Sequence, residues 1–106
     1  MVNTYNSERT VLATVIMAHF LDIKHAEKIP LYTDFFQNNF HKSVVNIINQ
    51  LRSEVGFVDE ELVEDRLARS GLLNVQMYTA ILSANPFASR KQLDLCIGNL
   101  KRNLVA

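Results

Sequence analysis

Apolar residues recur at steps of three and four along most of the chain, and this spacing predicts α-helices. The longest such pattern lies between Phe35 and Val55, where one helical stripe holds Phe40, Val44, Ile47, Ile48, Leu51 and Val55. Asn38 or Asn39 is a suitable N-cap, and Gly56 stands where a helix commonly ends. A helix this apolar needs partners on more than one side, so we predict that residues 35–55 form the central core helix.

The segment before that stretch predicts two further helices and a turn. The first helix is expected from Ser7 to Phe20, with Asn6 as its cap and Glu8 near its positive end. Its inward stripe consists of Val11, Leu12, Val15, Ile16 and His19, and Met17 and Phe20 widen this stripe. A short second helix is expected over residues 22–29, because Pro30 cannot continue it. Thr33 and Asp34 then form a start signal for a turn that carries Phe35 and Phe36.

Two more helices are predicted after the central stretch. Asp59 is a strong N-cap for the fourth helix, whose apolar face is Leu62, Val63 and Leu67 and which Gly71 closes. Asn74 caps the fifth helix, whose apolar side holds Tyr78, Ile81 and Leu82. Asn85 followed by Pro86 ends it, because the residue before proline avoids helical angles.

The last segment predicts a helix with a narrow apolar seam. Ser89 with Gln92 three residues later is a capping-box pattern. The seam is Leu93, Ile97, Leu100 and Leu104, and Arg90, Lys91, Asp94, Lys101 and Arg102 flank it. Such a seam is typical of helix pairing. It could meet this domain's own core, a second copy of the chain, or further sequence. We predict an interface formed by the four seam residues, with Arg90, Lys91, Lys101 and Arg102 either contacting the partner at its rim or forming a solvated face.

These elements together predict an all-α fold, a compact bundle of about six helices around a central helix. Strand-like alternation is hard to find, and no linker divides the chain. Residues 1–88 are expected to form a globular helical head, and residues 89–106 begin a C-terminal helix of the same domain.

Composition narrows the function classes. Eleven basic and eleven acidic residues cancel, so binding to nucleic acid by charge alone is disfavoured. The single cysteine, Cys96, excludes an intramolecular disulfide and is typical of a reducing compartment. The polar N-terminus has no signal core and no run approaches membrane-spanning length, so we expect a cytoplasmic protein that does not enter membranes.

Motifs that carry chemistry are absent from the sequence. It contains no glycine-rich phosphate loop and no nucleophile elbow. His19 and His25 do not share a helical face, and His41 has no Cys or Asp at ligand spacing, so no metal site is predicted. Glu60, Glu61, Glu64 and Asp65 form an acidic cluster whose spacing is typical of a solvated face paired with Arg66 and Arg69. We predict no catalytic, cofactor-binding or metal-binding residues, and a binding or assembly role.

Landmarks in the sequence resemble the N-terminal domain of DnaB-type replicative helicases. They follow one another in that family's order and share its spacing over most of the chain: Asn6-Ser7-Glu8-Arg9 with Val11-Leu12, Asp34-Phe35-Phe36, His41-Lys42, Leu51, Val58-Asp59, Leu62, Leu67, Gly71-Leu72, Tyr78, Leu82 and Pro86. Each motif alone is short. The spacing from Leu51 through Asp59 to Gly71 is the most specific part.

The resemblance implies a non-catalytic role in assembly. In that family these domains form a collar on the helicase hexamer, pair through a helical hairpin, and dock the C-terminal domain of a DnaG-type primase. Residues 89–106 would be the first helix of the hairpin, whose second helix lies outside this sequence. ATP and Mg²⁺ belong to the family's motor domain, which is also outside it, so no cofactor is expected here.

Two other interpretations stay open from the sequence. One is the helicase-binding C-terminal domain of a DnaG-type primase, which has a related helical head. The other is a small stand-alone helical regulator or weak DNA-binding protein, with residues 59–85 forming a helix-turn-helix. Residues 74–85 contain no Lys or Arg, which makes a poor recognition helix.

Overall fold

In the part of the chain that the structure describes, the regular structure is entirely helical, as the sequence predicts. The structure is a computed structural model that describes residues 4–84 and 89–104. Within that part the elements, in chain order, are α1 (Tyr5–Leu21), α2 (Lys24–Glu27), the 3₁₀ turn η1 (Thr33–Phe35), α3 (Asn39–Glu54), α4 (Glu60–Arg69), α5 (Val75–Leu82), α6 (Arg90–Lys101) and the 3₁₀ turn η2 (Arg102–Leu104). The predicted all-α bundle is therefore confirmed.

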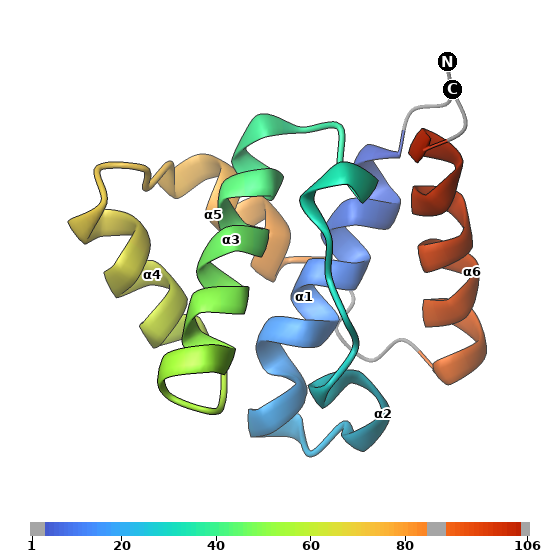
Figure 1. Cartoon of the computed structure of the whole chain (residues 1–106), viewed down its shortest axis with the longest axis horizontal. Coiled ribbons are helices and arrows are strands. Elements are labelled where there is room, and N and C mark those ends of the chain that lie inside the picture. Colours follow the sequence, from blue (N-terminus) through green and yellow to red (C-terminus); the bar gives the residue numbers. More distant parts are fainter. Residues whose placement is uncertain (1–3, 85–88, 105–106) are drawn as a thin grey trace.

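Helix α1 lies at the centre of the bundle. It packs against α2, α3, α4, α5 and α6, and Figure 1 shows it passing between α6 on one side and α3 on the other. Every residue from Val11 to Ile16 is buried, on all sides of the helix. Ala13, Thr14 and Ala18 are small enough to let neighbouring helices approach those sides closely. The prediction that residues 35–55 form the central helix is therefore wrong, since α3 packs on one flank of α1.

Helix α3 begins at Asn39, as the predicted N-cap requires, and Phe35 and Phe36 lie in and just after the turn η1 rather than in the helix. Phe35 ends η1, and Phe36 is extended and buried. The helix begins after Asn38, whose side chain accepts a hydrogen bond from the His41 amide at 3.1 Å. The predicted stripe is buried from Val44 to Leu51, whereas Val55 lies beyond the helix end and is 44% exposed.

The predicted N-caps of the last three helices are confirmed. Asp59 accepts a hydrogen bond from the Leu62 amide at 2.8 Å. Asn74 and Ser89 do the same for the amides three residues later, each at 3.1 Å. Gly71 follows α4 with φ of +70°, in the left-handed region that glycine adopts without strain. The predicted stop at Asn85-Pro86 lies outside the described residues.

Other predicted boundaries differ from the structure. Helix α1 starts at Tyr5, with Thr4 rather than Asn6 at the cap position. His19 and Phe20 were expected to face inward, but both are exposed, Phe20 by 76%. They lie past the buried part of α1, where the chain turns at Asp22 with φ of +58°. The helix predicted over residues 22–29 is limited to α2, residues 24–27. Ala26 is the residue of α2 that is buried, so the helix has too little apolar surface to be held over a greater length.

Candidate functional site

Helix α6, which carries the predicted interface, packs along α1 (Figure 1). Leu93 and Leu100 are buried in the core, each only 1% exposed. Ile97 is partly buried and packs against the same core, and the Leu104 side chain lies outside the described residues. The domain's own core thus covers Leu93 and Leu100. The prediction of an interface stays a prediction, and a partner would meet Ile97 and the basic residues.

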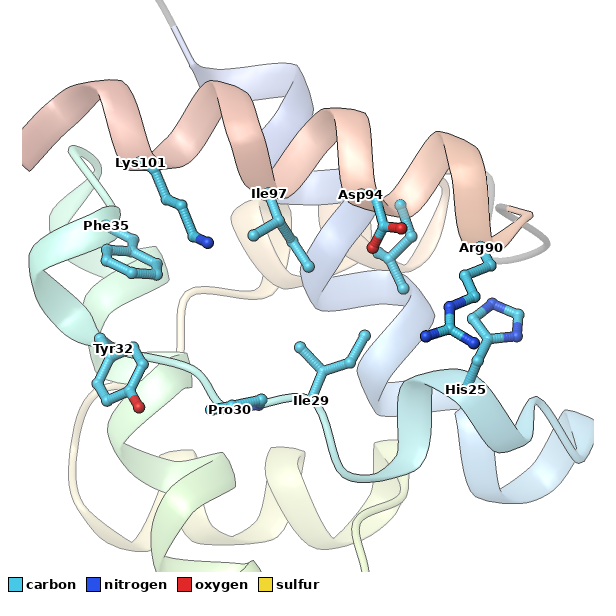
Figure 2. A pocket seen from close by; sticks show the side chains of 10 residues that line it. His25, Ile29, Pro30, Tyr32, Phe35, Arg90, Asp94, Ile97 and Lys101 are labelled. Carbon is cyan, nitrogen blue, oxygen red and sulfur yellow. The ribbon is translucent and has the colours of Figure 1, made fainter.

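A groove runs along one side of α6, where the segment from α2 to η1 lies opposite the helix. Figure 2 shows Arg90, Asp94, Ile97 and Lys101 on the α6 wall, and His25, Ile29, Pro30, Tyr32 and Phe35 on the opposite wall. The groove has a volume of about 490 Å³, and Leu93 also lines it. Ile97 and Ile29 point toward each other across its middle (Figure 2). The sequence pattern could not reveal this groove, because its walls come from segments that lie far apart in the chain.

The basic residues predicted for the interface divide into two pairs. Arg90 and Lys101 line the groove near its two ends, whereas Lys91 and Arg102 are exposed and do not line it. Within residues 4–84 and 89–104, none of these four side chains forms an ion pair or a hydrogen bond. Some other cations of the domain have partners, such as Lys24, which pairs with Asp22 at 2.8 Å. The four side chains on α6 and η2 are therefore available to a partner.

A second group of polar residues is buried where α1 meets α3. Glu8 is completely buried, and its carboxylate accepts hydrogen bonds from the Gln37 amide at 3.1 Å and the Asn38 amide at 3.3 Å. The Thr4 hydroxyl also donates to it. His41 is completely buried too, and its Nδ1 lies 2.8 Å from Glu8 Oε1. One carboxylate therefore connects the start of α1, the loop after η1 and α3.

The hydrogen bonds that Glu8 accepts decide whether its carboxylate is charged. Burial alone would raise the pKa of Glu8, but the hydrogen bonds from His41, Thr4 and the two backbone amides outweigh it and lower the pKa. Glu8 is therefore ionised near neutral pH and can only accept, so His41 Nδ1 carries the proton. His41 Nε2 is buried and has no hydrogen-bond partner within the described part of the chain. The imidazole also stacks on Tyr5, with ring centroids 5.3 Å apart.

The Glu8–His41 pair has the contacts of a structural centre, because neither side chain has exposed surface and each binds the other. We did not predict it, since we assigned Glu8 to the positive helix end and considered His41 only as a possible metal ligand. A signal was present in the sequence. Glu8 lies on the same stripe as the buried Val11, Leu12 and Val15, and His41 precedes the buried Val44 by three residues. A charged group on an apolar stripe needs a buried partner.

Other candidate chemistry is sparse. No three His, Cys, Asp or Glu side chains among the described residues gather closely enough to hold a metal ion. Cys96 is a free thiol and is partly buried. Glu60, Glu61 and Glu64 are exposed on α4, Asp65 pairs with Arg69 at 3.0 Å, and Arg66 pairs with Glu54 of α3 at 2.5 Å. None of the described helices combines the length and apolarity needed to cross a membrane.

Comparisons with models of protein families, with curated proteins and with solved structures found no match for this chain. A proposal for function therefore depends on the sequence landmarks and on the contacts that they make in this fold.

Proposed function

We propose that this chain is a protein–protein interaction domain of the kind that forms the N-terminal collar of DnaB-type replicative helicases. In this role it mediates assembly of the helicase hexamer and docks a DnaG-type primase during DNA replication in the cytoplasm. It performs no catalysis and holds no cofactor. ATP and Mg²⁺ would serve a motor domain outside this sequence.

The observation that carries the proposal is that the landmark residues contact one another. Glu8, from the first landmark, binds His41 at 2.8 Å and the backbone that directly follows Phe36. Arg9 donates from Nε to the Ala80 carbonyl at 2.8 Å, on α5 between the landmarks Tyr78 and Leu82. Residues from motifs that are individually common thus contact one another, as expected if the motifs together belong to one fold.

The distribution of polar groups supports binding rather than catalysis. The buried ionisable pair is enclosed and has partners, whereas Arg90, Lys91, Lys101 and Arg102 are exposed basic side chains of α6 and η2 without partners among the described residues. A helix with one buried face and one basic, accessible face is suited to docking a protein.

Calorimetric titration with the C-terminal domain of a DnaG-type primase tests the proposal. We expect saturable binding, weakened by reversing the charge of Lys91 and Arg102, and unchanged by Glu61→Lys on the far side of the molecule. Binding to a DnaB-type N-terminal domain instead of the primase domain would show that the chain is the primase's own helicase-binding domain. Absence of binding to either protein would refute both assignments.

A further inference from the structure

The groove beside α6 has an apolar middle and a cation near each end. Ile29, Pro30, Phe35, Leu93 and Ile97 supply its apolar surface. Arg90 and His25 lie near one end, and Lys101 lies near the other, beside Phe35 (Figure 2). Asp94 is the one acidic residue that lines the groove, and it lies on the Arg90 side (Figure 2). This arrangement suits a ligand that is apolar in its middle and negative at its ends.

The charge distribution of the whole domain favours an acidic ligand at this place. Residues 89–104, which contain α6 and η2, carry four basic residues against one acidic residue. Residues 59–69, which contain α4, carry five acidic residues against two arginines. Although the chain as a whole is neutral, an excess of positive charge therefore lies on one segment and an excess of negative charge on another. Figure 1 places α4 and α6 at opposite edges of the molecule. Such a field attracts acidic segments to α6 and repels them from α4.

The dimensions of the groove select the conformation of the ligand. Arg90 and Lys101 are eleven residues apart on one helix, which corresponds to roughly 16 Å along its axis at 1.5 Å per residue. A partner helix about 10 Å across could place only one of its faces in a groove of about 490 Å³. An extended segment of about five residues covers the same distance and places alternate side chains on one face.

We propose that this groove binds a short extended acidic peptide segment of a partner protein, with carboxylates at both ends and apolar side chains between them. The carboxylates pair with Arg90 and Lys101, whose charged groups have no partner within the described residues. The apolar side chains pack on Ile29, Phe35 and Ile97. The groove could bind such a peptide whether or not a primase domain binds, so the two proposals can fail separately.

Fluorescence anisotropy with a labelled synthetic peptide tests this inference. The probe has a seven-residue core, with glutamate at the first and seventh positions and leucine at the third and fifth, so that these four side chains lie on one face of the extended segment. We expect saturable binding that weakens by about fivefold with Arg90→Glu or Lys101→Glu, since a partly exposed ion pair is replaced by repulsion. Lys91→Glu and Arg102→Glu are matched controls, because they make the same change of charge on the same helix and its following turn, outside the groove.

The specificity of the site is tested from the peptide side. A peptide with glutamine in place of glutamate, and another with serine in place of leucine, should each bind at least fivefold more weakly. The proposal is overturned if the glutamate–leucine peptide shows no saturation at millimolar concentration, or if the control variants weaken binding as much as the groove variants. It is also overturned if oligothymidylate of equal charge binds the groove more tightly. Self-association that Arg90→Glu abolishes, with no peptide binding, would assign the groove to a second copy of the chain.

Discussion

Removing the Glu8 carboxylate should destabilise the whole domain. Glu8→Ala takes away the acceptor for four donors: the Thr4 hydroxyl, the Gln37 and Asn38 amides, and the His41 ring. Hydrogen bonds to a charged group contribute roughly 1.5–3 kcal/mol each, and each buried donor left without its acceptor costs about 1–3 kcal/mol. We expect a loss of roughly 3–5 kcal/mol, a large fraction of the 5–15 kcal/mol typical of a domain's stability.

Urea denaturation followed by circular dichroism measures this loss, with Glu61→Ala as the control. Glu61 is exposed on α4 and has no hydrogen bond or ion pair within the described residues, so its removal should change the free energy of unfolding by less than about 0.5 kcal/mol. A double-mutant cycle with His41→Ala separates the contribution of the pair. If Glu8→Ala costs less than 1 kcal/mol, or if the two changes are additive, the carboxylate does not hold α1 and α3 together as described.

The same carboxylate predicts a pH dependence. Its pKa in the folded protein is lowered from the ordinary value of 4.5. Glu8 therefore contributes its stability above pH 4.5, and this contribution is lost as the pH falls from that value through the lowered pKa. In Glu8→Gln this contribution is missing at every pH. The difference in unfolding free energy between wild type and Glu8→Gln should therefore shrink as the pH falls below 4.5, and a difference that stays unchanged down to pH 2 would contradict the assignment.

Three further predictions concern the helices. Asp59→Ala should cost about 1 kcal/mol in urea denaturation, because the Leu62 amide loses its acceptor; a neutral result would mean that this cap is not needed. Gly71→Ala should cost about 1 kcal/mol because of its positive φ, although a Cβ there meets no atom within 4 Å. Gly98→Ala in α6, where a Cβ is equally unobstructed, should instead stabilise by roughly 0.5–1 kcal/mol, and equal effects at the two sites would refute the backbone explanation. Leu100→Asp should abolish the thermal unfolding transition, since it places a carboxylate in the core, whereas Leu95→Asp should be tolerated because Leu95 is 65% exposed.

Local signals in the sequence predicted local structure well. The caps at Asn38, Asp59, Asn74 and Ser89 could be identified because a cap and the amide that it binds lie within one turn. The inward faces of α4 and α5 could be predicted in the same way, from the spacing of the apolar residues within each helix. Interactions of this kind depend on neighbours in the chain, which the sequence displays directly.

Features that depend on distant neighbours were harder to predict. The central position of α1 depends on how many other helices reach it, and periodicity reports only the direction of an apolar stripe. Small residues such as Ala13 and Thr14 are buried on sides that the stripe did not mark. Glu8 is separated by 33 residues from its partner His41. The groove likewise needs the segment that contains Ile29 and Phe35 to be placed against α6, which only the tertiary structure provides.

The hydrogen bonds of Asn103 have a consequence for synthesis on the ribosome. In η2, this side chain donates to the Phe35 carbonyl at 2.6 Å and to Thr4 Oγ1 at 3.3 Å, and its own oxygen accepts from Gln37 at 2.8 Å. The residues around Glu8 therefore obtain these partners only after Asn103 has left the exit tunnel. The helices α3 and α4 are close in the chain and can pair earlier. A nascent chain is thus expected to protect the α3–α4 pair first and to close the beginning of α1 last.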